Sequence, residues 1–171
     1  MTESTDVPSG RKPLIAGNWK MNMNHSQGRG LLLDVAQALA DTQHDYSRSE
    51  IAVFPPFTTL GAVRNVVQSD DLKVAYGGQD LSPFDSGAYT GDISGQFLAE
   101  LGCTYVLVGH SERRTFHHES DDTLQSKVKA AYRHLLTPVL CVGEGLEVRQ
   151  AGRHVEHTFG AVGGCCHGPH P

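Results

Sequence analysis

Short apolar runs alternate along this chain with longer segments in which apolar residues recur at helical spacing. The apolar runs lie at 14–17, 51–54, 74–78, 105–109 and 137–143, and each is bounded by Gly, Pro or a polar turn. Because these runs are continuously apolar rather than alternating between apolar and polar, they predict strands that are buried on both faces of a sheet.

The segments between these runs carry the spacing of amphipathic helices. Asp121 is predicted to cap a helix with an apolar face formed by Leu124, Val128, Ala131 and Leu135, since these residues share one side at 3.6 residues per turn.

Further helices are predicted in the other intervals. One covers 93–101 and ends at Gly102, the residue type that favours the left-handed conformation after a helix. Residues 31–39 and 60–67 predict two more, and 146–157 the start of another.

Strands joined by crossover helices must run parallel, which selects an α/β fold. The strand starts are spaced by about 31 residues, so eight such units would need about 248, close to the roughly 250 typical of a (β/α)8 barrel. The 171 residues of this chain have room for five units and part of a sixth. A doubly wound open sheet of five strands fits the same length, so the spacing leaves both folds open.

The two ends of the chain lack this pattern. Residues 1–12 contain no apolar stretch, and we expect a disordered N-terminal extension without a secretory signal. Residues 159–171 contain four glycines, two prolines and no charged residue, and we expect an unstructured tail. The predicted folded region is therefore 13–158.

Composition narrows the class of partner. Hydrophobic residues make up 39% of the chain and charged residues 19%, which suits a folded core. No apolar run approaches the roughly 20 residues that span a bilayer. A formal net charge of −5 without a Lys or Arg cluster disfavours a nucleic-acid surface. We expect a cytoplasmic protein that binds a small molecule or another protein, and neither a membrane nor nucleic acid.

The four cysteines follow no Cys-x-x-Cys spacing and predict no disulfide scaffold. Cys165 and Cys166 with His167 and His170 resemble a zinc cluster in composition. Adjacent cysteines do not readily occupy two corners of a tetrahedral site, however, and we expect no bound metal.

Polar residues follow the first predicted strand. Asn18 and Lys20 are two positions apart, so in extended backbone both side chains project to the same side, at the carboxyl end of a parallel strand. A cation there can hold an anionic group such as a phosphate. The alternative is a solvent-exposed lysine just beyond a strand.

A second polar cluster follows the fourth predicted strand. His110 is a candidate for proton transfer or hydrogen-bond donation. Glu112 with Arg113 and Arg114 can form an ion-pair network that orients it. A capped helix start with a solvated charge cluster is the alternative.

Two further features lie at strand ends. Glu144 follows the fifth predicted strand, where a helix N-terminus favours a carboxylate, and we assign it a structural role. The loop over 77–91 is longer than the roughly 2–6 residues usual between a strand and a helix. Its length favours a functional loop or a partner surface over a merely mobile segment.

Four strand-end motifs together resemble the triosephosphate isomerase family. They are AGNWKMN at 16–22, GGQDLSPFDSGAYTG at 77–91, YVLVGHSERR at 105–114 and PVLCVGE at 138–144. Their order and spacing also match. The resemblance covers residues 13–158 and implies a truncated, incomplete (β/α)8 TIM barrel with about five β/α units.

The resemblance also implies an activity and the residues that carry it. Enzymes of this family are usually homodimers and interconvert dihydroxyacetone phosphate and glyceraldehyde 3-phosphate in glycolysis and gluconeogenesis, through an enediolate and without a cofactor. By match to the motifs, Asn18 and Lys20 would bind substrate and His110 would polarise the carbonyl. Glu112 would support the site, and Thr90 would reach toward the partner subunit's active site.

The catalytic base of the family cannot be carried over. It is a glutamate in a motif resembling Ala-Tyr-Glu-Pro-Val-Trp after the sixth strand, and the one tryptophan here, Trp19, belongs to the first motif. The late carboxylates Glu144, Glu147 and Glu156 all fall in the fifth unit. The lid and the later phosphate-binding loops are also missing from the pattern, so we expect the chain itself to be inactive.

Two other functions remain open. One is a non-catalytic chain that keeps the loop 77–91 and pairs with an intact subunit. The other is a different α/β enzyme that uses Lys20 and His110 on a phosphorylated sugar.

Overall fold

The five apolar runs form five parallel strands, and helices fill the segments between them. The computed structural model describes residues 12–166. The strands are β1 (Leu14–Asn18), β2 (Glu50–Phe54), β3 (Ala75–Gly78), β4 (Tyr105–Val108) and β5 (Thr137–Leu140). The helices are α1 (His25–Asp41), α2 (Phe57–Ser69), α3 (Gly95–Glu100), α4 (Ser111–Phe116), α5 (Asp121–Arg133), α6 (Leu146–Gln150) and α7 (His154–Cys166).

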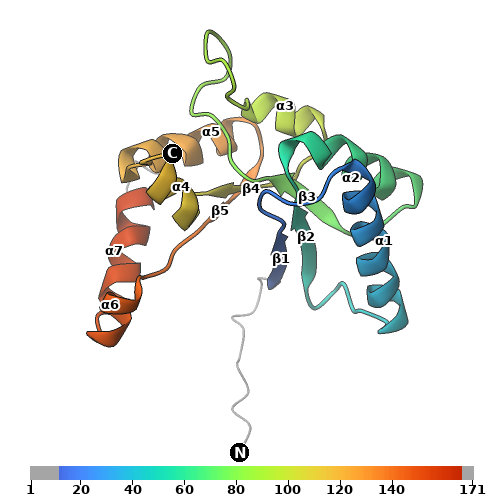
Figure 1. Ribbon diagram of the computed structural model, residues 1–171, viewed down its shortest axis with the longest axis horizontal. Coiled ribbons are helices and arrows are strands. Elements are labelled where there is room, and N and C mark those ends of the chain that lie inside the picture. The colour runs from blue at the N-terminus through green and yellow to red at the C-terminus, as the bar shows by residue number, and fades with distance from the viewer. Residues whose placement is uncertain (1–11, 167–171) are drawn as a thin grey trace, which may run out of the picture.

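Strand order decides between the two folds that the spacing left open. Each strand pairs in parallel with the next one along the chain, in the order β1-β2-β3-β4-β5. A doubly wound sheet instead reverses its strand order at a switch point. The chain therefore forms five consecutive strands of a barrel of the (β/α)8 type, with helices on the outer side of the curved sheet (Figure 1).

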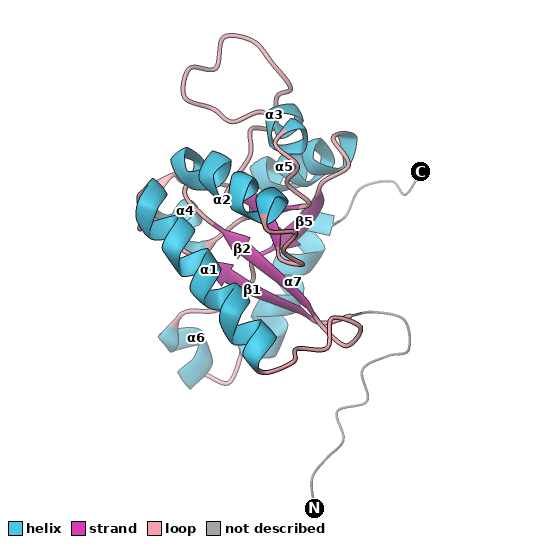
Figure 2. Cartoon of the chain, turned by 90° about the vertical axis from the view of Figure 1, so that its right-hand side faces the viewer, coloured by secondary structure: helices cyan, strands magenta, loops and turns pink. Residues whose placement is uncertain are grey.

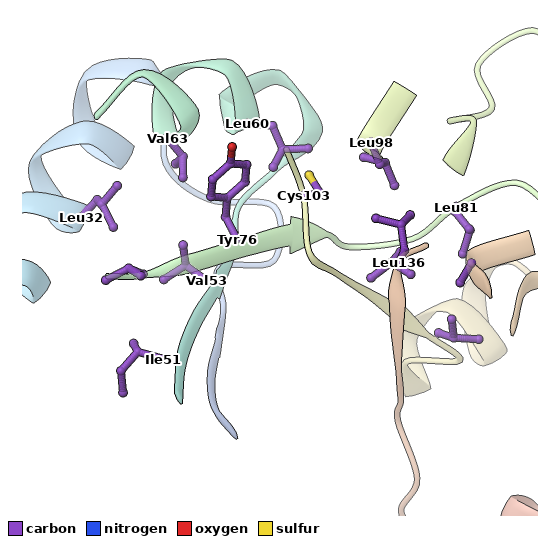
Figure 3. Close-up of a cluster of buried hydrophobic side chains, with 14 of the residues drawn as sticks. Leu32, Ile51, Val53, Leu60, Val63, Tyr76, Leu81, Leu98, Cys103 and Leu136 are labelled. Atoms are coloured by element: carbon purple, nitrogen blue, oxygen red, sulfur yellow. The ribbon is translucent and has the colours of Figure 1, made fainter. Parts of the chain in front are cut away.

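Alternate residues of the strands belong to two different apolar clusters, one on each face of the sheet. Ile51 and Val53 of β2 pack with the helices, where Leu32 of α1 is fully buried (Figure 3). Ala52 and Phe54 belong to a smaller cluster on the inner face, formed by strand residues. Figure 2 shows α1 and α2 lying against the strands that they cover.

Both faces of the sheet are apolar, and β2 and β4 are largely buried, as predicted. The prediction of burial on both faces is wrong for the two outermost strands, because Ile15 of β1 is 57% exposed and β5 is only partly buried.

Local capping sets the helix starts at positions slightly different from those predicted. The side chain of Ser120 caps α5 by accepting a hydrogen bond from a first-turn amide, so Asp121 is the first helical residue and not the cap. Ser94 caps α3 in the same way, and this helix begins at Gly95 instead of residue 93. Gly102, with a φ of 81°, follows the last turn of α3 and ends it as predicted.

The end of the described chain differs from the prediction. The sequence predicts an unstructured tail from residue 159, but α7 continues to Cys166. Val155 and Phe159 lie one helical turn apart and so indicate a helix, but the glycines that follow them argue against one. Gly164 also suits the approach of α7 to α5, because a Cβ there would lie 3.0 Å from the Asp121 carboxylate.

The other terminal predictions fall outside the described residues. They are the extension over 1–12, apart from Lys12, and the last part of the tail, 167–171. The side chains of the predicted Cys165–His170 cluster are likewise not described. Within residues 12–166, no helix is both long and apolar enough to cross a membrane.

Replacing Leu124 with Ala tests the packing of the helices on the sheet. Leu124 is 0% exposed, so Leu124→Ala leaves a cavity and should lower the free energy of unfolding by about 2–5 kcal/mol. Leu146→Ala is the control, because Leu146 is 70% exposed and its loss should change that free energy by less than about 0.5 kcal/mol. Urea unfolding followed by circular dichroism measures both, and equal effects would contradict the described core.

Candidate functional site

The loops that leave β1 and β4 at their carboxyl ends meet on one side of the molecule. Asn18 and Lys20 come from the end of β1, and His110 and Glu112 follow β4. Lys20 and Glu112 are in contact although 92 positions separate them along the chain. All four residues line a cavity of about 580 Å³, which Gln79 from the end of β3 also lines. The structure thus brings the four predicted strand-end residues together.

Lys20 reaches this cavity through a left-handed backbone conformation. Its φ is 53°, which costs about 1–2 kcal/mol for a residue other than glycine. The Lys20 amide donates a hydrogen bond of 2.9 Å to Asn18 Oδ1, and this contact closes the turn. The predicted extended backbone from Asn18 to Lys20 is wrong, because β1 ends at Asn18 and the chain turns there.

The Lys20 ammonium forms an ion pair with Glu112. Nζ lies 2.6 Å from Oε1, and both side chains are about half exposed. The hydrogen bond from Lys20 is the main reason that the pKa of the Glu112 carboxyl lies below its ordinary value, and the charges of Lys20 and His110 act in the same direction. Glu112 is therefore anionic near neutral pH and holds the ammonium at the cavity.

His110 is the N-cap residue of α4. Its Nδ1 lies 3.3 Å from the Glu112 amide nitrogen and accepts a hydrogen bond from it. A nitrogen that accepts carries no proton, so the neutral ring has its proton on Nε2 and offers an N–H donor. Glu112 Oε2 lies 3.5 Å from the same Nδ1, a contact that becomes an ion pair only in the protonated ring. The predicted alternative, a capped helix start, is therefore present, and the same side chain also lines the cavity.

Gly109 allows His110 to take this position. Its φ is 72°, and a Cβ added at Gly109 would lie 2.7 Å from Leu124 Cδ1. Both the backbone conformation and the space therefore require glycine before the histidine.

Four charged side chains form a buried ion group next to the cavity. Lys127 Nζ lies 2.6 Å from Asp80 Oδ1 and 2.6 Å from Glu119 Oε1. Arg113 closes the group, with Nη2 2.8 Å from Asp80 Oδ2 and Nε 2.7 Å from Glu119 Oε1. The buried ion group joins the loop after β3 to α4, to the segment after α4, and to α5. Asp80 and Arg113 also line the cavity.

Burial has a large effect on the carboxylates of this group. Burial raises the pKa of Asp80 above its ordinary value in spite of the two cations beside it. Burial also acts to raise the pKa of Glu119, but the hydrogen bonds and charges of Lys127 and Arg113 outweigh it, and that pKa is lowered. Lys127 is 4% exposed, so loss of one partner would leave a buried charge uncompensated, at a cost of about 3–5 kcal/mol.

Sequence reasoning missed most of the buried ion group. It predicted a network of Glu112 with Arg113 and Arg114, but Glu112 pairs with Lys20, and Arg113 belongs to the buried ion group. Arg114 donates to a backbone carbonyl and pairs with a carboxylate on α5. Lys127 could have indicated this group. It lies on the apolar face of the predicted helix, and a cation that is buried there needs a carboxylate partner.

Glu144 lies in the loop between β5 and α6 and is held by a cation of α6. Its Oε1 lies 2.8 Å from Arg149 Nε, which agrees with a structural role. Glu144 lines a second cavity of about 640 Å³ together with His110 and Cys141. Burial raises the pKa of the Cys141 thiol, so this thiol stays protonated near neutral pH.

The long loop between β3 and α3 stands out from the rest of the molecule (Figure 1). Asp85 anchors it to the end of α5 through Arg133, whose Nη2 lies 2.8 Å from Oδ1. The rings of Phe84 and Tyr89 stack with centroids 4.1 Å apart. Thr90 follows them and is exposed.

The described residues contain no group of three or more His, Cys, Asp or Glu side chains that could hold a metal ion. The cavity instead offers an ammonium group from Lys20 and an imidazole N–H from His110. Such donors stabilise negative charge that develops on an oxygen atom. The arrangement suits a small anionic substrate.

Comparisons with known proteins agree on one family. A family model described as triosephosphate isomerase matches residues 13–168, which extends past the boundary at 158 that the motifs suggested. The chain is 58% identical over 154 residues to a protein named triosephosphate isomerase from Streptomyces avermitilis, covering 90% of this chain and 59% of the relative. It is 56% identical over 149 residues to the protein of that name from Mycobacterium tuberculosis, covering 87% of this chain and 56% of the relative.

A solved structure gives the same result. The crystal structure of triosephosphate isomerase from Bartonella henselae matches with a TM-score of 0.78 and 35% identity, over 91% of this chain and 62% of that one. The chain thus spans less than two thirds of the length of the relatives that it matches.

Lys20→Met tests the ion pair at the cavity. Without the ammonium, Glu112 loses the hydrogen bond that favours its charged form, and its pKa should rise toward the ordinary value. Since the folded-state pKa lies below the unfolded-state value, the pair stabilises the fold above the ordinary carboxyl pKa. That contribution is lost as the pH falls through the folded-state pKa.

Carbon-13 NMR titration of the Glu112 carboxyl measures this shift. Lys129→Met is the control, because it removes the same charge from α5 and should leave the titration of Glu112 unchanged. An unchanged Glu112 pKa in Lys20→Met would contradict the ion pair.

Proposed function

Because the chain belongs to the triosephosphate isomerase family, we propose that it carries the substrate-binding and electrophilic side chains of a site that interconverts dihydroxyacetone phosphate and glyceraldehyde 3-phosphate. The observation that carries the proposal is the cavity where Lys20 and His110 lie together at the ends of β1 and β4. A cation and a hydrogen-bond donor at one cavity suit a substrate with a phosphate and a carbonyl group.

The proposed reaction moves a proton between neighbouring carbons of the substrate. Its enediolate intermediate carries negative charge on oxygen, which positioned donors and a cation stabilise. The His110 Nε2–H donates to the substrate oxygen, and the Lys20 ammonium, held by Glu112, stabilises the developing charge. Asn18 holds the turn that presents Lys20. A proton transfer of this kind needs no cofactor.

The base that removes the carbon-bound proton is assigned to a residue outside 12–166. The carboxylates that line the two cavities are Asp80, Glu112, Asp121 and Glu144, and each is paired with a lysine or an arginine. A carboxylate that is held by a cation is a weaker base. We therefore expect this chain by itself to bind the substrate and to convert it no faster than buffer.

Titration of dihydroxyacetone phosphate into the nitrogen-15-labelled chain tests the proposed site. Amide signals of the segments that contain Lys20 and His110 should shift. Lys20→Met should weaken binding about 10–100-fold, the equivalent of one hydrogen bond to a charged group. Lys129→Met removes the same charge elsewhere and should bind as the unmodified chain does.

Two results would overturn parts of this proposal. A folded chain that does not bind dihydroxyacetone phosphate would exclude the substrate assignment. Turnover of glyceraldehyde 3-phosphate at about 1–1,000 per second, the ordinary range for enzymes, would exclude the assignment of the base.

We also propose that the long loop contacts a second subunit in a homodimer. Phe84, Tyr89 and Thr90 are exposed on this loop. Met21 and Phe116, at the cavity of the β1 and β4 loops, are 95% and 74% exposed and offer an apolar surface to receive it. The same contact would let the chain pair with an intact subunit of a relative, which is the second candidate function.

Thr90→Arg tests this contact. A charged side chain at the loop tip should be poorly accommodated in an interface and weaken self-association about tenfold or more, as analytical ultracentrifugation would measure. Thr104→Arg is the control, because Thr104 is exposed just before β4, at the opposite, amino edge of the sheet. Equal association of the two variants, or a monomeric unmodified chain at millimolar concentration, would contradict the proposed interface.

The proposed setting is the cytoplasm, where the reaction would serve glycolysis and gluconeogenesis. The relatives named as isomerases support this role. Cys103 and Cys141, the cysteines whose side chains the structure describes, are free thiols. Free thiols are usual in a reducing compartment.

A further inference from the structure

Lys20 holds its strained backbone conformation by contacts at both ends of the residue. Its φ of 53° lies in the left-handed region. On one side, its amide donates to Asn18 Oδ1 over 2.9 Å. On the other side, its carbonyl accepts a hydrogen bond of 2.8 Å from the side chain of Gln79. The contact to Gln79 crosses from β1 to the end of β3.

The Gln79 amide group fits between two carbonyl oxygens. Its Nε2 lies 2.8 Å from the oxygen of Lys20 and 2.8 Å from the oxygen of Phe54, at the end of β2. Both neighbours are acceptors, so only the amide nitrogen with its two N–H groups satisfies them. The Phe54 oxygen also accepts from the Trp19 amide over 3.0 Å. Gln79 therefore ties the turn after β1 to the ends of β2 and β3.

The next residue fixes Gln79 itself. Asp80 belongs to the buried ion group, where it contacts Lys127 at 2.6 Å and Arg113 at 2.8 Å. Arg113 lies beside Glu112 in α4, the helix that His110 caps. The pair of residues Gln79 and Asp80 thus holds the loop of Lys20 with one side chain and the helix of Glu112 with the other.

We propose that Gln79 is a positioning residue that holds the Lys20 ammonium against Glu112 and the substrate by fixing the left-handed backbone of Lys20. Gln79 acts through Lys20 and does not act on the substrate itself. This inference rests on the proposed function for its effect on substrate, but the contact between Lys20 and Glu112 can be measured without any ligand.

Loss of the Gln79 amide should free the backbone of Lys20. Methionine has nearly the shape of glutamine but no N–H donor, so Gln79→Met keeps the packing and releases the Lys20 carbonyl. The turn then relaxes from the left-handed region, and the ammonium is no longer held at 2.6 Å from Glu112.

The first experiment follows Glu112 in the absence of ligand. In Gln79→Met, the pKa of the Glu112 carboxyl should rise toward the value measured in Lys20→Met. Gln96→Met is the control, because the Gln96 side chain donates to Glu100 on the exposed side of α3, and its loss should leave Glu112 unchanged. A Glu112 titration in Gln79→Met that matches the unmodified chain would overturn the proposal, whether or not the chain binds substrate.

The second experiment separates positioning from a general structural effect. Gln79→Met should weaken binding of dihydroxyacetone phosphate about 2–10-fold, the range expected for one hydrogen bond. In the Lys20→Met background it should have no further effect, because the group that Gln79 positions is gone. An equal loss in both backgrounds would overturn the proposal. If no variant binds while the Glu112 result holds, the proposed function fails and the positioning contact stands.

A third variant covers the case in which Gln79→Met does not fold. Gln79→Glu has the same length, and its ionised carboxylate repels the two carbonyl oxygens. When protonated, it regains one donor. The two carbonyl oxygens raise the pKa of the new carboxyl, so the contact between Lys20 and Glu112 should recover once the pH falls below that pKa, and it is lost again only where Glu112 itself becomes protonated. Recovery as the pH rises instead would contradict the account.

Discussion

All five strands run parallel, so every loop that leaves a strand at its carboxyl end emerges at the same edge of the sheet. This constraint brings Lys20 and Glu112 into contact across 92 positions of sequence. No local preference of either segment could do so, because each loop contributes only part of the site. The apolar clusters on both faces of the sheet pack the strands against one another and against the helices, and so stabilise the sheet on which the shared edge depends.

The shared edge places the loops near one another, and charges then fix their positions. The buried ion group links Asp80, Arg113, Glu119 and Lys127 from four different segments. Burial makes each of its ions costly when unpaired, so the group holds together only if all the segments are in place. The exposed pair of Lys20 and Glu112 contributes little stability by comparison. Its importance lies in the position that it gives to the ammonium.

Much of the fold could be predicted from the sequence, because the spacing of apolar residues in each strand and helix follows from which positions are buried. The strands at 51–54 and 105–108 are apolar because both faces of the sheet are covered. Helix ends were harder to predict. Ser120 caps α5 although the adjacent Asp121 is an equally good cap by residue type, and only the geometry of the preceding turn distinguishes them.

The sequence predicts which residues belong to the site, but not which contacts hold them in place. Lys20 and His110 were found because each follows a strand. That Lys20 adopts a left-handed conformation, and that Gln79 supports it, depends on contacts between distant segments that carry no periodic signal. The helix at 159–166 was missed because its glycines argue against a helix, whereas packing of α7 on α5 favours one.

Zero-length cross-linking with a carbodiimide tests most directly whether the loops after β1 and β4 lie together at the carboxyl edge of the sheet. The reagent activates the Glu112 carboxyl, and the Lys20 amine displaces the urea leaving group to form an amide bond. With Nζ 2.6 Å from Oε1 and both side chains about half exposed, digestion and mass spectrometry should find Lys20 linked to Glu112. The link should be absent from the unfolded chain. A folded chain in which Lys20 is linked to other carboxylates but not to Glu112 would contradict the account.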